Sequence, residues 1–195
     1  MKGTVDFKHV AYLVSKSEKL RLKAQMEAGQ LYLLSKEEMM IEFNEHPVTK
    51  EIEAGQMAQN SSGTLGGYGN LFSFIGFEGG DRPIERLRDL LQRGTNFNFT
   101  PETEREENEI TYTYSVTLPS DEQILEVTKM PFEEGTSWAL GIEKGISGFS
   151  NYLSGFFGVS RSGGGIETQS RIRAKDFKPM PYLKGIFRSF QQKFK

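Results

Sequence analysis

The feature that most constrains the fold is an apolar stripe near the N-terminus that repeats with the period of an α-helix. Its spacings of three, four and seven residues place the side chains on one face of a helix. The sequence therefore predicts a long helix, or two helices in series, from about Phe7 to Asn44. His46-Pro47 ends it, because the residue before a proline is pushed out of helical geometry. The stripe consists of Leu13, Leu20, Ala24, Leu31, Leu34 and Ile41.

The length of this helix is large compared with the length of the chain. A chain of 195 residues can form one domain with a substantial hydrophobic core. A helix of more than 30 residues, roughly 45 Å or more in length, reaches beyond what one small core can cover. We therefore expect part of the helix to be covered by another subunit.

The remainder of the chain predicts an antiparallel sheet with short helices, so the expected fold class is α+β. The clearest strand alternates apolar and polar residues from Ile110 to Leu118, which is typical of a sheet with one buried and one wet face. Further strands are predicted at 71–77, 137–146 and 166–173, and an acidic loop at 102–109. Short helices are expected after Pro83, with Asp81 as its cap, and after Ser120, where Gln123 completes a capping box.

No linker or internal repeat divides the chain, so a single domain over 1–195 is expected. Its parts are an N-terminal helical segment (1–45), a sheet with short helices and an extended glycine- and aromatic-rich hairpin arm (46–178), and a short basic closing helix (179–195). Tyr182, Ile186, Phe187 and Phe190 give the closing helix its apolar spacing.

The residues needed for familiar catalytic and metal sites are scarce. The chain has no cysteine, and its two histidines, His9 and His46, lack ligand-like neighbours. No phosphate-binding or dinucleotide-binding glycine motif is complete, and no histidine follows Gly145-Ile146-Ser147-Gly148 to serve a nucleophilic serine. We expect no cofactor, no metal and no enzymatic activity; a site built from carboxylates or backbone groups alone is the enzymatic alternative.

Hydropathy and charge limit the compartments in which the protein is expected and the partners that it could bind. The N-terminus does not show the charged segment followed by an apolar run that is typical of a secretory signal. No apolar window is long enough to cross a membrane, so a soluble protein is expected. The net charge of −2 is unevenly distributed: 171–195 carries +7 and the first 170 residues carry −9. Two interpretations stay open, namely contact with nucleic acid and docking of the basic end on the acidic body of an adjacent copy. The residues concerned are Arg171, Arg173, Lys175, Lys178, Lys184 and Arg188.

Aromatic residues among glycines suggest a second contact surface. The segment 148–165 contains rings that a flexible stretch cannot bury by itself, and interfaces favour aromatic anchors. An ordinary sheet with bulges at the glycines is the equally weighted alternative. The interface prediction comprises Tyr68, Phe72, Trp138, Tyr152, Phe156, Phe157 and Arg161, the last at the tip of the arm.

Four motifs carry a resemblance to a known family: NLFSFIGF at 70–77, SWALGIEKGISG at 137–148, SRSG at 160–163 and FKPMPYL at 177–183. In these four motifs, the chain resembles the tail-completion, or head–tail joining, proteins of tailed bacteriophages. The order of its predicted elements is also similar: a long helix, a small sheet and a closing helix after Pro181-Tyr182-Leu183. The usual members are shorter, so the long first helix and the acidic segment are departures.

The resemblance implies a virion structural protein, assembled in the host cytoplasm, that forms a homo-oligomeric ring at the phage neck. Its implied partners are copies of itself, the head–tail connector or adaptor and the tail tube, with possible transient contact to DNA and none to a membrane. A tail terminator, or another minor tail or baseplate protein, is the alternative within the same class. A nucleic-acid-binding module that uses the basic C-terminus is the alternative of another class.

Overall fold

A computed structural model describes residues 17–66, 69–106, 109–131, 133–144 and 177–195. They form the expected α+β fold. The elements in chain order are α2 (Glu18–Glu45), α3 (Pro47–Glu53), the 3₁₀ turn η1 (Gly55–Met57), α4 (Leu71–Ile75), α5 (Pro83–Gly94), β1 (Asn96–Glu106), β2 (Glu109–Thr117), α6 (Asp121–Val127), β3 (Lys129–Met130), β4 (Glu133–Ser137), α7 (Trp138–Lys144) and α10 (Leu183–Gln192).

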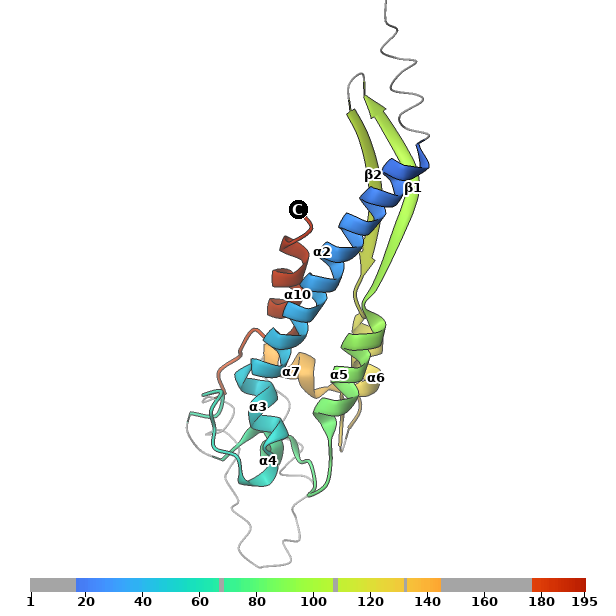
Figure 1. The fold of residues 1–195 in the computed structure, drawn as a ribbon. Helices are drawn as coiled ribbons and strands as arrows, with labels where there is room; N and C mark the ends of the chain where they lie inside the picture. Colours follow the sequence, from blue (N-terminus) through green and yellow to red (C-terminus); the bar gives the residue numbers. More distant parts are fainter. Residues whose placement is uncertain (1–16, 67–68, 107–108, 132, 145–176) are drawn as a thin grey trace, which may run out of the picture.

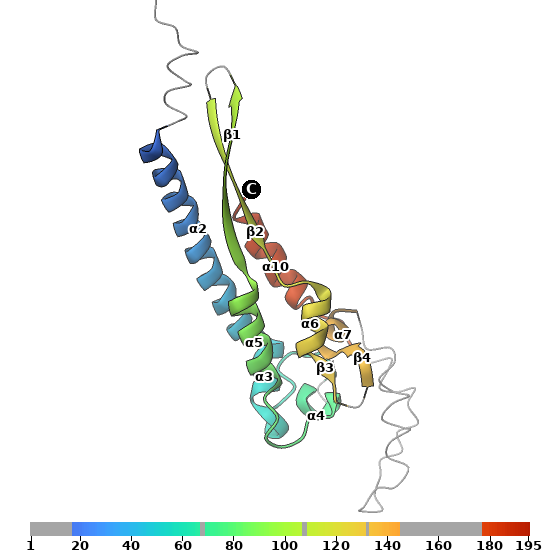
Figure 2. The ribbon, with the colours of Figure 1, turned by 90° about the vertical axis from the view of Figure 1, so that its right-hand side faces the viewer.

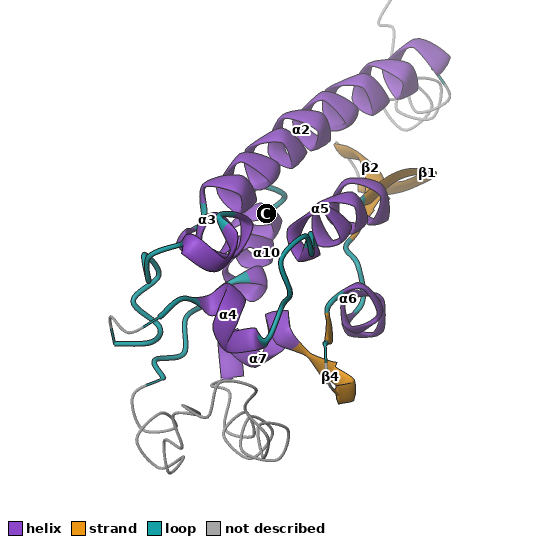
Figure 3. Cartoon of the chain, turned by 90° about the horizontal axis from the view of Figure 1, so that it is seen from below, coloured by secondary structure: helices purple, strands orange, loops and turns teal. Residues whose placement is uncertain are grey.

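The long helix α2 sets the length of the molecule, because its 28 residues span about 42 Å. The β1–β2 hairpin lies along its N-terminal half and α10 along its C-terminal half, while the other short helices gather at its C-terminal end (Figure 1). In the view turned by 90°, α2 and α10 lie on either side of the hairpin (Figure 2). Seen from below, α5 runs beside α2, with α6 and α7 farther away (Figure 3).

The predicted helix is confirmed over Glu18–Glu45, and residues 7–16 lie outside the described part. It ends where expected: His46 is extended, and Pro47 is the first residue of α3. The face that α2 buries, however, is not the apolar stripe that predicts the helix. Tyr32, Ser35, Met39 and Phe43 face the core, where the Phe43 ring stacks on Tyr182 at a centroid distance of 6.1 Å.

The strand predicted at 110–118 is confirmed as β2, and it pairs with β1 in an antiparallel hairpin. In β2 the side chains of Tyr112, Tyr114 and Val116 are half-buried and the intervening Thr111, Thr113 and Ser115 are exposed, as the alternation predicts. The prediction of a loop at 102–109 is wrong, because β1 continues to Glu106. The register shifts between Thr100 and Thr103, where Pro101 has no N–H to donate to the ladder.

Two segments predicted as strands are helices, because local caps decide their geometry. At 71–77, the Asn70 side chain accepts a hydrogen bond from Ser73 N at 2.9 Å, and Gly76 ends α4 with a φ of 93°. At 137–146, β4 ends at Ser137. The Ser137 hydroxyl then accepts from Leu140 N at 3.1 Å and starts α7. The third predicted strand, 166–173, and the hairpin arm that it would close lie outside the described residues.

The other predicted helices are confirmed as α5, α6 and α10. Both hydrogen bonds of the capping box between Ser120 and Gln123 are present in α6. Asp81 does not cap α5 as expected. Its carboxylate accepts from Glu78 N at 2.8 Å and tightens the preceding turn instead.

One buried carboxylate organises the loop between α3 and α4. Glu51 is 1% exposed and accepts hydrogen bonds from Ser62 N (2.8 Å), Leu71 N (2.7 Å) and Asn60 Nδ2 (3.0 Å). A carboxylate can accept several such bonds at once, so a single side chain of α3 holds the middle of the loop and its end at Leu71. The start of α4 thereby depends on α3.

We predict that Trp138→Ala destabilises the fold by about 3–5 kcal/mol, because it removes a large, fully packed side chain. Trp138 is 1% exposed, and its ring meets Phe77 edge-on at 5.9 Å. Urea unfolding followed by far-UV circular dichroism measures the change. Met57→Ala is the control, since Met57 is 93% exposed and should change stability by less than about 0.5 kcal/mol.

A second prediction concerns Glu51. Glu51→Gln should lower the free energy of unfolding by about 2–3 kcal/mol, because an amide offers one acceptor oxygen where the carboxylate offers two, and buried N–H groups lose their partner. Glu85→Gln on the exposed face of α5 is the matched control. Equal stability of the two variants in urea titrations would contradict the role given to Glu51.

Candidate assembly surface

The position of α2 is fixed at the C-terminal end of α5. Lys36 Nζ donates to the backbone oxygens of Gln92 (2.6 Å) and Thr95 (3.0 Å), and the Tyr32 hydroxyl donates to Thr95 O at 2.6 Å. The last carbonyls of a helix have no partner within it, and a cation there also meets the negative end of its dipole. Two residues of α2 therefore attach the middle of this helix to α5.

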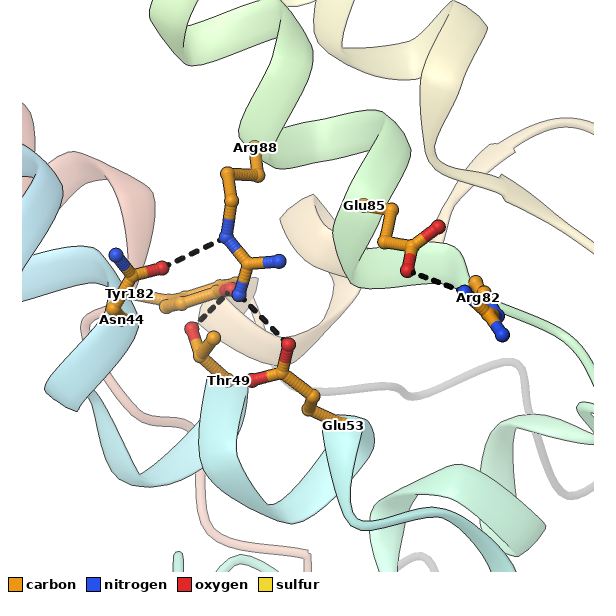
Figure 4. A network of polar contacts seen from close by, with 7 residues as sticks. All are labelled: Asn44, Thr49, Glu53, Arg82, Glu85, Arg88 and Tyr182. Atoms are coloured by element: carbon orange, nitrogen blue, oxygen red, sulfur yellow. Dashed lines mark hydrogen bonds and ion pairs between the residues drawn. The ribbon is translucent and has the colours of Figure 1, made fainter.

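A second attachment comes from α5 itself. Arg88 extends between α2 and α3, where Nε donates to Asn44 Oδ1 at 2.9 Å and Nη2 donates to Glu53 Oε1 at 2.8 Å (Figure 4). Figure 4 also shows the hydroxyl pair of Tyr182 and Thr49 beside it, with the two oxygens 2.8 Å apart. The guanidinium group holds the turn between α2 and α3 against α5.

His46 completes the junction between α2, α3 and the segment before α10. Its Nδ1 accepts from Val48 N at 3.3 Å and its Nε2 lies 3.2 Å from Pro181 O, which fits a neutral ring with the proton on Nε2. Burial lowers the pKa of His46, while Pro181 O and Glu42 act in the opposite direction. Burial also raises the pKa of the neighbouring Tyr182.

All these attachments lie in the C-terminal half of α2, and none of its residues before Tyr32 is buried. The helix carries seven of the eight large apolar side chains that are exposed among the described residues. Leu34 is 61% exposed and Ile41 55%. We call the described part of the apolar stripe the outer stripe. It consists of Leu20, Ala24, Leu31, Leu34 and Ile41.

Acidic side chains flank the outer stripe near its C-terminal end. Glu37 and Glu42 are exposed, and neither has an ion-pair partner in the described part of the chain. Glu38, by contrast, forms an ion pair with Lys193 of α10. Glu38 lies on the same helix face as the outer stripe, since it is four residues after Leu34 and three before Ile41, and Glu27 lies on it between Ala24 and Leu31. The outer stripe is therefore a row of apolar side chains with carboxylates on it and along its edges.

A groove of about 380 Å³ lies between β2 and α10. Its apolar lining comes from two segments that are about 75 residues apart in the sequence. The Tyr114 and Phe194 rings meet edge-on at 6.3 Å, and Phe194 meets Phe190 at 5.0 Å. We call it the β2–α10 groove; its apolar residues are Tyr112, Tyr114, Val116, Leu118, Phe190 and Phe194.

The groove has one basic edge. Lys184, Arg188 and Lys195 are exposed, and none has an ion-pair partner among the residues that the structure describes. The four-residue spacing of Lys184 and Arg188 places them on one side of α10, next to Gln191, which lines the groove, and Lys195 follows Phe194, another lining residue. We call these three residues the basic rim.

The structure separates the residues predicted from sequence as contact residues. Phe72 and Trp138, expected at an interface, lie in the core at 3% and 1% exposure, because caps fold their segments into buried helices. Lys178, Lys184 and Arg188 are exposed, and their role as contact residues stays a prediction. Tyr68, Tyr152, Phe156, Phe157, Arg161, Arg171, Arg173 and Lys175 lie outside the described residues.

Sequence analysis missed the β2–α10 groove. The alternation in β2 and the apolar spacing of α10 each indicate one apolar face, but neither pattern shows that the two faces meet with a gap between them. The apolar stripe of α2, by contrast, is visible in the sequence. What the pattern lacks is a signal that Tyr32, Met39 and Phe43, rather than the leucines, turn toward the core.

Comparison of the chain with protein-family models, with curated proteins and with solved structures gives no match. No group of three or more metal-ligating side chains gathers within the described ranges. Of the described helices, none combines the length and the apolar character needed to cross a membrane.

The pKa shift of His46 predicts a pH dependence of stability. Because the pKa in the folded state lies below the usual 6.5, the unfolded chain binds the proton more readily, and stability falls as the pH is lowered through about 6.5. Urea unfolding at pH 7.5 and 5.5 should show a larger loss for the wild type than for His46→Asn, which keeps a capping acceptor but does not titrate. An identical loss in both proteins would contradict this assignment.

Proposed function

We propose that this protein is a non-enzymatic assembly subunit that works by packing against copies of itself. The observation that supports this most directly is the concentration of exposed leucine, isoleucine and methionine on α2. Scattered exposed apolar residues are ordinary, but contiguous rows on one element are typical of surfaces that bind protein. The apolar β2–α10 groove adds a concave surface to this convex one.

We further propose the more specific role that the sequence resemblance implies, a ring-forming virion protein at the neck of a tailed bacteriophage. A closed ring requires two different contact surfaces on each subunit, one for each neighbour. The outer stripe and the groove supply two surfaces of different shape and opposite edge charge. A tail terminator or minor tail protein also needs two contact surfaces. The position in the virion therefore depends on which neighbouring proteins, such as the connector or the tail tube, the ring binds.

Binding of nucleic acid by the basic C-terminus is the second candidate. Lys178 and the basic rim favour it, because exposed cations on one side of a helix can contact phosphates. Such binding weakens steeply as salt rises, by counterion release. Fluorescence anisotropy with a labelled duplex at 50 and 200 mM salt tests it, and absence of binding at 50 mM would remove this candidate.

The assembly proposal predicts that the purified protein forms species larger than one chain at micromolar concentration. Leu34→Glu should raise the concentration for half-assembly at least tenfold, because it places a charge in the outer stripe without disturbing the core. Sedimentation velocity measures both effects. Glu85→Lys, a charge change on the exposed side of α5, is the control. A wild-type protein that stays monomeric up to about 100 μM would overturn the proposed function.

A further inference from the structure

We infer that the outer stripe of one copy docks into the β2–α10 groove of the next copy, in a head-to-tail contact. This inference rests on the proposed function and names the two surfaces that meet. The occupant of the groove is a second copy of α2, and the argument depends on shape, charge and polarity.

Within one copy, the leucines and the isoleucine of the outer stripe stay exposed. The buried face of α2 packs toward the hairpin and toward the segment that leads into α10: Tyr32 stacks on Phe97 at 5.4 Å, and the Phe43 ring stacks on Tyr182 at 6.1 Å. At about 100° per residue, Leu34 and Ile41 lie roughly 140–160° around the helix from buried Met39. Leu34 and Ile41 therefore point away from the core-facing side of α2, and no residue in the described part of the chain covers them.

The two surfaces of the proposed contact are both apolar, and their edges carry opposite charges. The groove offers aromatic and aliphatic side chains with the basic rim along one edge, formed by Lys184, Arg188 and Lys195. The outer stripe offers leucine and isoleucine with Glu37 and Glu42 along its edges. Opposite charges at the edge of an apolar contact guide association and fix its register more than they add affinity. This complementarity identifies α2 as the occupant.

These contacts fix the direction of the docked helix. β2 runs in the same direction as α2, and α10 runs opposite to both (Figures 1 and 2). Because Phe194, just after α10, meets Tyr114 of β2, Lys184 and Arg188 lie toward the Leu118 end of the groove. Glu37 and Glu42 lie in the C-terminal half of α2. A helix docked parallel to α2 therefore brings these carboxylates toward Lys184 and Arg188.

A parallel, head-to-tail contact has a structural consequence. Each copy uses its stripe toward one neighbour and its groove toward the other, so the contact repeats with a constant rotation and closes into a ring when that rotation divides a full turn. Because neighbouring α2 helices point the same way, the ring has two different ends.

Cysteine cross-linking tests the contact directly, because the chain has no cysteine of its own. Leu34→Cys and Gln191→Cys proteins, one carrying a small tag, are mixed and treated with a short thiol-reactive cross-linker. We expect cross-links between the two different chains, and none when either variant is alone. Leu34→Cys chains that cross-link to each other would show pairing of two α2 helices and overturn the inference. Asp89→Cys on α5 replaces either partner as the control.

Charge reversal provides a second test on the full chain. Glu42→Lys and Arg188→Glu should each raise the concentration for half-assembly at least tenfold in sedimentation velocity, and the equimolar mixture should restore it. Far-UV circular dichroism confirms that each variant is folded. If the wild type assembles but neither variant is weakened, the inference fails while the proposed function stands. If the wild type never assembles, both fail.

Discussion

The structure depends on the way α5 holds the C-terminal half of α2. Lys36 extends from α2 to the last carbonyls of α5, and Arg88 extends from α5 to the end of α2 and to α3. Each group uses a charge to satisfy several hydrogen bonds in one place, which is stronger than the same number of neutral bonds. These contacts set the direction in which α2 extends from the core. As a result, the residues of α2 before Tyr32 lie outside the core.

That geometry accounts for the unusual surface of α2. The helix is anchored over about half of its 42 Å, and the leucines before Tyr32 lie beyond these contacts. Leu34 and Ile41 lie within the anchored half but on the opposite side of the helix from buried Met39. The aromatic side chains of α2 that face the core are larger than the leucines that stay outside: Tyr32 stacks on Phe97 and Phe43 on Tyr182, and Met39 is buried with them. The described part of the chain does not bury these leucines, and the association that we propose would remove them from water.

The sequence predicts some of these features and not others, for identifiable reasons. Elements marked by long periodic patterns or by local caps were predicted: α2, β2, α5, α6 with Ser120 and Gln123, and α10. The short apolar runs at 71–77 and 137–146 fit a strand or a helix equally well, and single hydrogen bonds accepted by the Asn70 and Ser137 side chains favour the helix. The α2 half of the candidate surface is present in the sequence as the stripe. The groove is not, because it depends on β2 and α10 coming together across the fold.

The proposed contact also bears on the hairpin. A two-stranded sheet leaves the outer edges of β1 and β2 without a strand partner among the described residues, and such edges can pair with other chains. A neighbour's α2 lying along β2 would cover the face beside one of these edges and restrict the approach of another strand. The same docking would therefore bury the leucines of one subunit and protect a strand edge of the next. Since a helix cannot extend a β-ladder, its presence would favour one defined assembly over open-ended strand pairing.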